Sequence, residues 1–489
     1  MAKNLMIQGT MSGVGKSILT AGILRVLHQD GYRVVPFKSQ NMALNSFVTP
    51  DGKEIGRAQA LQAAAAGMEP SSDMNPILLK PMGDTTSQVI INGLPLANMK
   101  ARDYFRQKKS YIPDILAAYE RLAKEADIIV IEGAGSPVEI NLRENDIVNM
   151  GLAEILDAPV FLAGDIDPGG VFAQLLGTMN LLSEKERDRV KGLIINKFRG
   201  DVTLLEPGLD MFKAYCDVPF VGVVPFTLLD LDEEDSVSER LKIRNRADSG
   251  DTVVSIKVVR LPFISNYTDF TILENIPGVS LSYVNAPEAL DNADLVILPG
   301  TKNTLGDLKW LKESGFFDKI REMAAEDTLI IGICGGFQML GRCIKDPDHS
   351  EIGGEALGLS LLPVDTVFEK SKNLRQVSAT IGTVSGVYGP LSGMAVSGYE
   401  IHMGESSGDK DTFPVITEGS VLGTYIHGIF DTAEVTGALL QIIYDKKGIK
   451  TPVPEIESAF VHQEKELNKL ADVLRQSLDW ELIYRAIGI

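Results

Sequence analysis

Residues 4–17 have the sequence NLMIQGTMSGVGKS, and this stretch decides the fold of the first half of the chain. Residues 4–8 are a short apolar run typical of a buried strand, and residues 17–30 have the pattern of a helix. The glycines between them allow backbone N–H groups to turn towards a phosphate, and the start of a helix adds partial positive charge. A strand, a glycine-rich loop and a helix in this order predict a nucleotide-binding loop.

This loop also carries the side chains that nucleotide binding requires. Lys16 would reach the β- and γ-phosphates, and the hydroxyl of Ser17 would ligate Mg²⁺. The loop is one residue longer than the strict pattern GxxxxGK[ST], because its first glycine stands one position earlier. The alternative is a plain glycine-rich turn that opens a helix. We expect ATP to be held by the loop residues Thr10, Gly13, Gly15, Lys16 and Ser17.

Further apolar runs extend this pattern along the first half. They lie at residues 33–37, 127–131, 159–163 and 191–195, with helical stretches between them. Continuous apolar strands separated by helices indicate an α/β fold with a parallel sheet that is covered on both faces.

Polar side chains follow three of these strands, at the edge where parallel sheets bind ligands. Lys38 is a second candidate for the phosphates, although a solvated surface lysine is an equal alternative. Glu132 would hold Mg²⁺ together with Ser17, unless it only caps its strand. Asn196 and Lys197 resemble the start of purine-recognising loops, so they are added to the predicted ATP site.

The second half begins a new series of strands after an acidic, polar stretch. Apolar runs return at residues 252–259, 294–298 and 328–331, and residues 455–489 have the pattern of a helix. We therefore predict an ATP-binding domain at 1–229, a linker at 230–250, and a second α/β domain at 251–489 that includes the C-terminal helix.

The strongest signal of the second half is residues 329–341, LIIGICGGFQMLG. An apolar strand enters Gly-x-Cys-x-Gly and then a helix, which is the elbow that exposes a strained nucleophile. Cys334 is the predicted nucleophile, the alternative being a buried structural cysteine. The N–H groups of Gly335 and of Gly300, which follows another strand, would form an oxyanion hole.

A thiol nucleophile needs a base, and the chain has five histidines. His28 lies on the first helix of the other domain, His349 in a polar loop and His462 on the terminal helix. We favour His427 as the base, because it follows a strand-like run and a glycine follows it. His402 is expected to line the site or a contact between the domains.

The composition of this chain of 489 residues limits the classes of partner that it can be expected to bind. Its 66 acidic and 47 basic side chains give a net charge of −19, which repels nucleic acids and anionic membranes, and we find no basic run that offsets it. Its cysteines, Cys216, Cys334 and Cys343, form neither a disulfide framework nor a zinc pattern. Without a long apolar run or a signal-peptide layout, we expect a cytoplasmic protein without a tightly bound metal, nucleic acid or membrane partner.

Seven stretches resemble the glutamine-hydrolysing cobyric acid synthases, and the resemblance covers nearly the whole chain. These stretches are residues 37–46, 54–59, 74–81, 132–137, 196–201, 299–304 and 332–336. The first half also resembles dethiobiotin synthetase, whose phosphate loop is longer, and the second half resembles a class I-like glutamine amidotransferase. The resemblance implies a P-loop NTPase-type domain followed by an amidotransferase α/β domain. It supports Lys38 and Glu132 as phosphate and metal ligands, with Asp51 or Glu54 as a further ligand.

The resemblance implies amidation of the peripheral b, d, e and g carboxylates of adenosylcobyrinic acid a,c-diamide, which gives adenosylcobyric acid in cobalamin biosynthesis. The substrates would be this corrinoid, glutamine and ATP with Mg²⁺, and a homo-oligomer is left open. The first domain would phosphorylate the carboxylate. Cys334 would attack the glutamine amide, His427 would protonate the departing ammonia, and the ammonia would need a water-poor route to the acyl phosphate.

Four other functions are alternatives to that of a cobyric acid synthase. A cobyrinate or hydrogenobyrinate a,c-diamide synthase shares both domain types, but residues 40–45 favour the cobyric branch. A CTP-synthase-type enzyme has an acid two residues after the base, where this chain has Ile429, so a Cys–His dyad is expected. A partition-type regulatory ATPase, or a scaffold with an inactive second domain, would leave the elbow at Cys334 unexplained.

Overall fold

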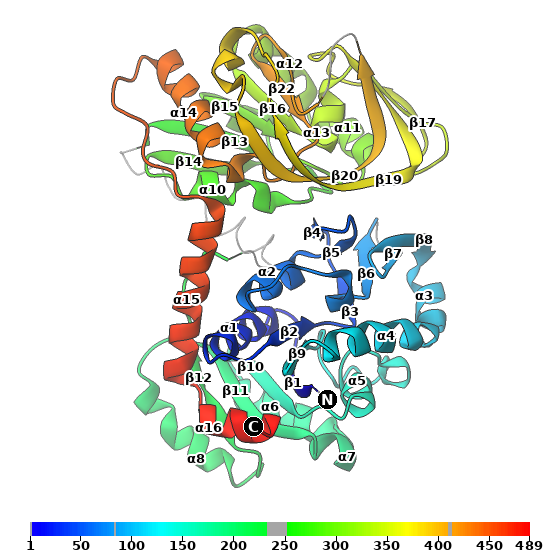
Figure 1. Ribbon diagram of the computed structural model, residues 1–489, viewed down its shortest axis with the longest axis vertical. Helices are drawn as coiled ribbons and strands as arrows, with labels where there is room; N and C mark the ends of the chain where they lie inside the picture. The colour runs from blue at the N-terminus through cyan, green and yellow to red at the C-terminus, as the bar shows by residue number, and fades with distance from the viewer. Residues whose placement is uncertain (1, 83–84, 232–251, 409–412) are drawn as a thin grey trace. The chain divides into compact units, whose positions relative to one another are not determined.

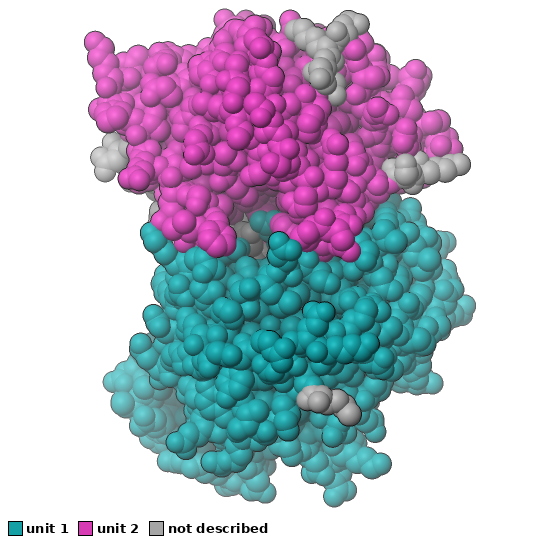
Figure 2. Space-filling model, in the orientation of Figure 1, with its two compact units in different colours: residues 1–43, 53–235, 463–489 teal, residues 44–52, 236–462 magenta. Residues whose placement is uncertain are grey.

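The structure is a computed structural model that describes residues 2–82, 85–231, 252–408 and 413–489. It divides into two compact units, which Figure 2 shows in different colours. Unit 1 consists of Met1–Ala43, Lys53–Asp235 and Gln463–Ile489, and unit 2 of Leu44–Gly52 and Ser236–His462. The linker predicted at 230–250 lies, apart from its first two residues, outside the described residues.

The core of unit 1 is a six-stranded sheet in which every neighbouring pair is parallel (Figure 1). In spatial order its strands are β12 (Phe220–Pro225), β11 (Val190–Phe198), β10 (Val160–Asp165), β1 (Lys3–Gly9), β9 (Ile128–Glu132) and β2 (Val34–Phe37). The predicted parallel sheet is confirmed, since each apolar run noted in the first half forms one of these strands.

Both faces of this sheet are buried, because successive side chains of a strand point to opposite faces. On one face, Leu5 and Ile7 of β1 pack with helix α1 (Lys16–Gln29). On the other face, Met6 belongs to a core that includes side chains of α4 (Ile112–Ala123) and α6 (Val171–Leu181). Burial on both faces explains why these strands are apolar throughout.

Strand β1 lies in the middle of the sheet, between β10 and β9. The chain passes from β1 to β2 on one side and later crosses to β10 on the other. The carboxyl ends of three strands therefore meet here, with Gly9 level with Ala163 and Ile7 level with Glu132. In open parallel sheets, ligands bind at such a reversal of strand order.

Unit 1 also contains a small four-stranded sheet, which the sequence did not predict. Its strands are β3 (Gln40–Met42), β6 (Ile77–Pro81), β7 (Thr86–Ile91) and β8 (Leu94–Lys100), in that spatial order. Strand β3 follows β2 closely in the chain, so this sheet is attached beside the carboxyl edge of the large one.

The C-terminal segment packs within unit 1, whereas the linear division of the sequence grouped it with the second half. Helix α15 (Ala459–Ser477) buries Leu470 and Leu474 in the core that contains α1. The two helices approach closely, because a Cβ at Gly22 of α1 would lie 2.3 Å from Leu474. This contact joins residues more than 400 positions apart.

A short segment near the N-terminus, Leu44–Gly52, belongs to unit 2 instead. It contains β4 (Ser46–Val48), and Val48 is buried with Tyr399 and Ile401. The hydroxyl of Tyr399 lies 3.4 Å from the carbonyl oxygen of Ser46. Unit 2 is therefore completed by residues from the first half of the sequence.

The large sheet of unit 2 has the order β14 (Val279–Val284), β13 (Val254–Val259), β15 (Leu295–Leu298), β16 (Leu329–Ile333), β22 (Val421–Thr424) and β21 (Ile416–Glu418). All pairs are parallel except β21 with β22. Helices α11 (Thr304–Glu313), α12 (Phe316–Ala325) and α13 (Gly335–Leu340) pack into the core on one face, and α14 (Ala433–Lys447) into the core on the other (Figure 1). The second predicted α/β unit is confirmed.

A second sheet of unit 2 has the order β18 (Gly354–Leu357), β17 (Cys343–Asp346), β19 (Val364–Thr380) and β20 (Ala395–Gly408). Its two longest strands, β19 and β20, form an antiparallel pair that carries several polar side chains of the site described below.

Candidate active sites

The phosphate loop of unit 1 runs from the end of β1 at Gly9 to the start of α1 at Lys16. Gly13 and Gly15 have φ angles of +72° and +90°, which glycine adopts without the strain of a Cβ. A Cβ at Gly9 would lie 2.4 Å from Cγ1 of Val14, so the loop is tightly wound there. The structure thus has the glycine-dependent turn that the sequence predicted.

Four side chains meet behind this loop: Ser17, Lys38, Glu132 and Gln62. Ser17 Oγ donates to Glu132 Oε1 at 2.8 Å, and Lys38 Nζ lies 2.9 Å from the same oxygen. The other oxygen of Glu132 accepts from Nε2 of Gln62, on α2 (Arg57–Ala65), at 2.6 Å. Because the hydrogen of Ser17 points to Glu132, the lone pairs of its Oγ are left for a cation.

The charge of Glu132 is held in place by these contacts. Its side chain is 1% exposed, and burial alone raises the pKa of a carboxyl group. The ammonium of Lys38 and the hydrogen bonds from Gln62 and Ser17 outweigh burial, so the pKa of Glu132 lies below its ordinary value. The site therefore contains a carboxylate and an ammonium at neutral pH.

Lys16 and Thr10 connect the loop to neighbouring elements. Lys16 Nζ donates to the carbonyl oxygens of Met11 at 3.0 Å and of Gly135 at 3.2 Å, the second of which follows β9. Thr10 Oγ1 donates to the side chain of Gln174 on α6 at 3.2 Å. The lysine thus bends over the loop that would surround the phosphates.

Asn196 and Lys197 come to the same loop from the end of β11. Asn196 Nδ2 donates to the carbonyl oxygen of Val14 at 2.8 Å, and Lys197 Nζ to that of Gly13 at 2.6 Å. Lys197 also pairs with Asp165 at 3.0 Å and has a φ of +60°. In this arrangement both side chains contact the phosphate loop of the predicted ATP site.

The sequence left Asp51 and Glu54 as alternatives for a further metal ligand. Glu54 forms a buried ion pair with Lys80, at 2.6 Å, and Asp51 belongs to the segment of unit 2. Within the described residues, no group of three or more His, Cys, Asp or Glu side chains could hold a metal ion. Ser17 and Glu132 are the predicted metal-site residues that the structure brings together.

The elbow of unit 2 has the strained geometry that the sequence predicted. Strand β16 ends at Ile333, α13 begins at Gly335, and Cys334 between them has φ +50° and ψ −110°. This positive φ is unfavourable for a residue with a Cβ. A Cβ at Gly336 would lie 2.0 Å from the carbonyl oxygen of Leu298, so the turn requires glycine there.

The neighbours of β16 in the sheet bring the other predicted groups to the elbow. On one side, β15 is followed by the loop that contains Gly300; a Cβ on Gly300 would lie 3.0 Å from Cε1 of His427. A Cβ on Gly335 would lie 2.6 Å from Cγ2 of Thr301, so the two predicted oxyanion glycines belong to adjacent loops. On the other side, β22 is followed by His427.

His427 has a carboxylate partner that sequence analysis missed. Its Nδ1 lies 2.7 Å from Oδ2 of Asp269, on the short helix η5 (Tyr267–Phe270), and both side chains are buried. Oδ1 of Asp269 accepts from the N–H of Gly428 at 3.1 Å. The expectation of a Cys–His dyad without a carboxylate is therefore wrong: the acid comes from a distant loop and not from position 429.

The protonation of His427 follows from these contacts. Burial lowers the pKa of the imidazole, but the charge and hydrogen bond of Asp269, together with the hydrogen bond to Cys334, raise it to about 10. The ring also stacks on Tyr399, with 5.3 Å between centroids. His427 is thus held in one orientation, as a proton donor, beside the thiol.

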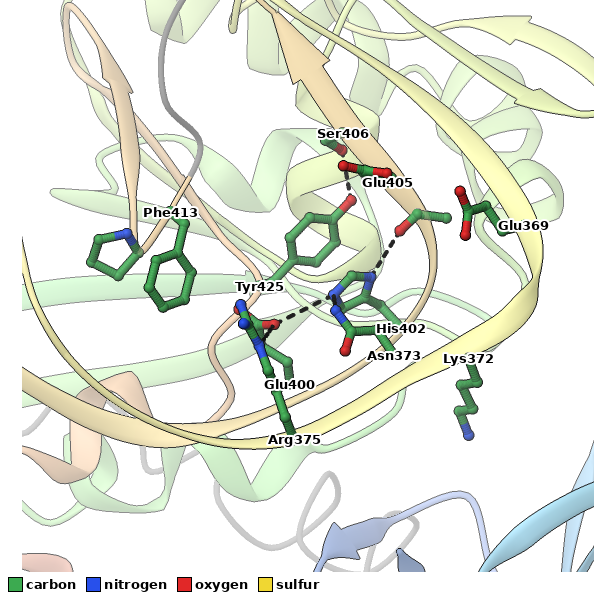
Figure 3. A pocket seen from close by; sticks show the side chains of 12 residues that line it. Glu369, Lys372, Asn373, Arg375, Glu400, His402, Glu405, Ser406, Phe413 and Tyr425 are labelled. Atoms are coloured by element: carbon green, nitrogen blue, oxygen red, sulfur yellow. Dashed lines mark hydrogen bonds and ion pairs between the residues drawn. The ribbon is translucent and has the colours of Figure 1, made fainter. Parts of the chain in front are cut away.

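His402 lines a pocket of about 440 Å³ on the β19–β20 pair (Figure 3). Its ring stacks on Tyr425 at 3.7 Å between centroids, and its Nδ1 lies 2.9 Å from the carbonyl oxygen of Gly404. Arg375 Nε donates to Glu400 Oε2 at 2.6 Å in the same pocket. His402, which we expected to line the site or a contact between the domains, thus lines this pocket.

This pocket lies close to the elbow. Cys334 Sγ is 3.5 Å from the carbonyl oxygen of Ile401, next to His402 in the chain. Gln338, on the helix that follows Cys334, donates to the hydroxyl of Tyr425 at 3.2 Å. The pocket and the elbow are therefore neighbours through Tyr425, which lines the pocket and contacts the helix after Cys334; Cys334 itself is not a lining residue.

Comparisons with known proteins show the family of both halves of the chain. Residues 5–237 match the CobQ/CobB/MinD/ParA nucleotide binding domain, and residues 255–435 match the CobB/CobQ-like glutamine amidotransferase domain. The cobyric acid synthase of Lachnoclostridium phytofermentans is 52% identical, over 99% of each chain. That of Ruminiclostridium cellulolyticum is 50% identical, over 100% of this chain and 97% of the other.

The chain belongs to the cobyric acid synthase family. The predicted order of a nucleotide-binding domain and a glutamine amidotransferase domain is confirmed by the two family matches. Full-length similarity to proteins of this name favours the cobyric branch over the a,c-diamide synthases and over a regulatory ATPase. In this member of the cobyric acid synthase family, no helix within the described residues is long and apolar enough to cross a membrane.

Proposed function

We propose that this chain uses ATP and glutamine to amidate the peripheral b, d, e and g carboxylates of adenosylcobyrinic acid a,c-diamide, giving adenosylcobyric acid in cobalamin biosynthesis. The observation that carries the proposal is the buried His427–Asp269 pair beside the strained Cys334, in a chain that also contains the phosphate loop. The thiol site serves to release nitrogen, and the phosphate site serves to activate an acid.

In unit 2, the thiol proton of Cys334 passes to His427, and the sulfur attacks the side-chain amide carbon of glutamine to form a tetrahedral intermediate. The N–H groups of Gly300 and Gly335 stabilise its oxyanion. His427 donates a proton to the leaving nitrogen, so ammonia departs and a thioester remains, which water hydrolyses to glutamate. Asp269 accepts a hydrogen bond from Nδ1 of His427 and so fixes the orientation and charge of the ring.

The pocket of about 440 Å³, whose lining residue Tyr425 contacts the helix after Cys334, suits glutamine as the nitrogen donor. Glutamine is a zwitterion at neutral pH, and the pocket is lined by charges of both signs, among them Arg375 and Glu400. Burial raises the pKa of Glu400, but His402 and Arg375 outweigh burial, so the pKa lies below its ordinary value and the group is ionised.

In unit 1, the γ-phosphoryl group of ATP is transferred to the carboxylate, because a free carboxylate is a poor acyl donor; ADP leaves, and ammonia then displaces phosphate from the acyl phosphate to give the amide. Catalysis of the phosphoryl transfer consists of positioning and of charge neutralisation. Lys16 and Lys38 supply positive charge to the phosphates, and loop N–H groups between Thr10 and Gly15 enclose them. Ser17 and Glu132 fit Mg²⁺, which when bound would neutralise the developing phosphate charge.

Mass spectrometry of the corrinoid tests the proposal. The a,c-diamide is incubated with the full chain, ATP, Mg²⁺ and glutamine. Each amidation replaces OH with NH₂, so we expect a series of products that differ by this exchange and ends when all target carboxylates are amides. Unchanged corrinoid under these conditions would contradict the proposal. Conversion only of cobyrinic acid at its a and c positions would favour the diamide synthases.

A further inference from the structure

Residues 100–109, KARDYFRQKK, form a basic segment in a chain whose net charge is −19. The segment contains five basic side chains and one acidic side chain, Asp103. This corrects the expectation that no basic run offsets the acidic surface. The segment comprises the end of β8, helix α3 (Ala101–Gln107) and the start of η2 (Lys108–Tyr111).

Most of the positive charge of this segment lies on side chains that form no ion pair within the described residues. Among the described residues, the exposed side chains of Lys100, Arg102, Arg106 and Lys109 make no ion pair. Other arginines of unit 1 do pair with acids, for example Arg121 with Asp73, at 2.6 Å. The segment therefore differs from the ordinary mixed surface around it.

Lys108 differs from the other basic residues of the segment because it is largely buried. The residue as a whole is 8% exposed, and among the described residues its ammonium makes no hydrogen bond but is not one of the buried unpartnered polar atoms, so it reaches solvent. Nζ lies 5.1 Å from the ring centroid of Phe105. Burial lowers the pKa of Lys108, and the nearby charge of Asp146 opposes this only in part. The stem of Lys108 is thus packed in the protein while its ammonium stays at the surface, where it can meet an anionic ligand.

Two residues of the segment, Tyr104 and Lys108, lie next to residues that are near the phosphate site in the chain or in space. Tyr104 of α3 donates to Oε1 of Gln40 at 2.6 Å, and Gln40 follows Lys38 by two residues. Asp146, which acts on Lys108, accepts from the N–H of Asn149 at 2.9 Å.

Asn149 in turn holds the turn that contacts the phosphate loop. Its Nδ2 donates to the carbonyl oxygen of Ala134 at 2.6 Å. The next residue, Gly135, accepts from Lys16. The basic segment therefore lies in the surroundings of the site at which an acceptor acid would be activated.

We propose that residues 100–109 bind the carboxylates of the acceptor that are not reacting at the phosphate loop. This inference rests on the proposed function, in which the acceptor carries several carboxylates while one of them is phosphorylated. The acceptor is a polyanion approaching an acidic protein, so binding requires a local positive surface. Arg102, Arg106 and Lys109 would attract the carboxylates through water, and Lys108 would contact one of them directly.

The test compares two triple variants of the full chain that remove the same charge. Arg102→Gln/Arg106→Gln/Lys109→Gln neutralises the segment. Lys124→Gln/Lys185→Gln/Arg187→Gln neutralises exposed cations elsewhere in unit 1. The probes are the corrinoid a,c-diamide and the same molecule with its remaining carboxylates converted to methyl esters.

We expect the segment variant to bind the free acid about 10-fold more weakly, because each exposed charge contributes about 2-fold. The loss should shrink at high salt, since salt screens exposed charges. The control variant should bind the acid like the wild type, and both variants should bind the ester like the wild type. Lys108→Met, which keeps the apolar stem, should weaken acid binding by a further factor while leaving ATP affinity unchanged.

Two results would overturn the inference: equal loss of acid binding in both triple variants, or equal loss for acid and ester. If the wild type amidates the corrinoid and the segment variant keeps its KM, only this inference fails. If the wild type neither binds nor amidates the corrinoid, the proposed function fails with it. Loss of duplex DNA binding in the segment variant, with corrinoid binding unchanged, would also contradict the assignment.

Discussion

The phosphate loop of unit 1 and the elbow of unit 2 are both strand–turn–helix connections at the carboxyl edge of a parallel sheet. They differ in which residue takes the positive φ. In unit 1 it is glycine, at Gly13 and Gly15, so the backbone is unstrained and open to an anion. In unit 2 it is Cys334, a buried residue that a strained backbone holds beside His427. In the proposed function, the same local architecture would position a phosphate without a covalent bond in one unit and carry the attacking thiol in the other.

The buried charges of the two sites are also tuned in opposite directions. In unit 1 a lysine lowers the pKa of the carboxyl of Glu132, and the result is a cation site. In unit 2 a carboxylate raises the pKa of His427, and the result is a proton donor. Each site contains a buried ion pair, Lys38–Glu132 in unit 1 and His427–Asp269 in unit 2. Some of the variants below remove one partner of each pair.

The largest expected effect is that of Cys334→Ser. We expect glutamine-dependent amidation to fall by about 10⁴-fold or more, because the nucleophile is lost. Amidation with ammonium chloride should remain close to that of the wild type, since unit 1 is unchanged. Corrinoid products are quantified for both nitrogen sources. Full activity of this variant with glutamine would contradict the assignment of Cys334 of unit 2 as the nucleophile.

Asp269→Asn is expected to lower kcat/KM for glutamine by about 10³-fold, as loss of an orienting acid does in other triads. Ammonia-dependent amidation should not change. Asp294→Asn is the control, because Asp294 is an acid of unit 2 that pairs with Lys447 instead. Equal effects of both substitutions on glutamine hydrolysis would show that Asp269 only stabilises the fold.

The His427–Asp269 pair also predicts a pH dependence of stability. The folded pKa of His427, about 10, lies above the ordinary value of 6.5, so folding is favoured while the ring is protonated. This contribution is complete below pH 6.5 and is lost as the pH rises towards 10. Denaturant unfolding across this range should therefore show a fall in the free energy of unfolding that is smaller in Asp269→Asn. An identical slope in both proteins would contradict the assignment.

In unit 1, Lys38→Met should lower amidation by about 10²-fold with either nitrogen source, because a charge at the transferring phosphate is lost. It also leaves Glu132 buried without its cation, which destabilises the fold. Lys80→Met is the matched control, since Lys80 likewise forms an ion pair with a buried carboxylate, that of Glu54. A comparable loss of activity in both variants would mean that Lys38 acts only through stability.

The smallest expected effect is that of Gln62→Leu. Gln62 donates to Glu132 and, at 3.3 Å, to the carbonyl oxygen of Ser17, so it orients the pair assigned to Mg²⁺. We expect ATP binding in the presence of Mg²⁺ to weaken about 10-fold and metal-free ATP binding to remain unchanged. Gln59→Leu is the control, because Gln59 is equally buried on the same helix but accepts from Asn41. Equal effects in calorimetry would contradict the positioning role.

The comparison also shows what the sequence can predict. The residues that form each turn are consecutive in the sequence, so Lys16, Ser17 and Cys334 could be found without a structure. Lys38 and Glu132 could be found because each follows an apolar strand and the carboxyl ends of parallel strands share one edge. For such residues, local pattern and sheet topology together determine position.

Residues that depend on distant packing could not be found in this way. Asp269 is 158 positions from His427 and lies on a short helix without a motif. Gln62 lies on an ordinary helix of small residues, and its role follows only from the distance to Glu132. The placement of Leu44–Gly52 in unit 2 and of Gln463–Ile489 in unit 1 likewise depends on tertiary contacts that exchange segments between the two halves.

The central claim is that nitrogen released at Cys334 is consumed at the acid activated beside Lys16. The most direct test supplies glutamine labelled with ¹⁵N in its side-chain amide together with an equal concentration of unlabelled ammonium, and measures the corrinoid product by mass spectrometry. The account predicts that the new amides carry the ¹⁵N label almost completely. Label diluted to the proportion of ammonium in the medium, or absent from the corrinoid, would contradict it.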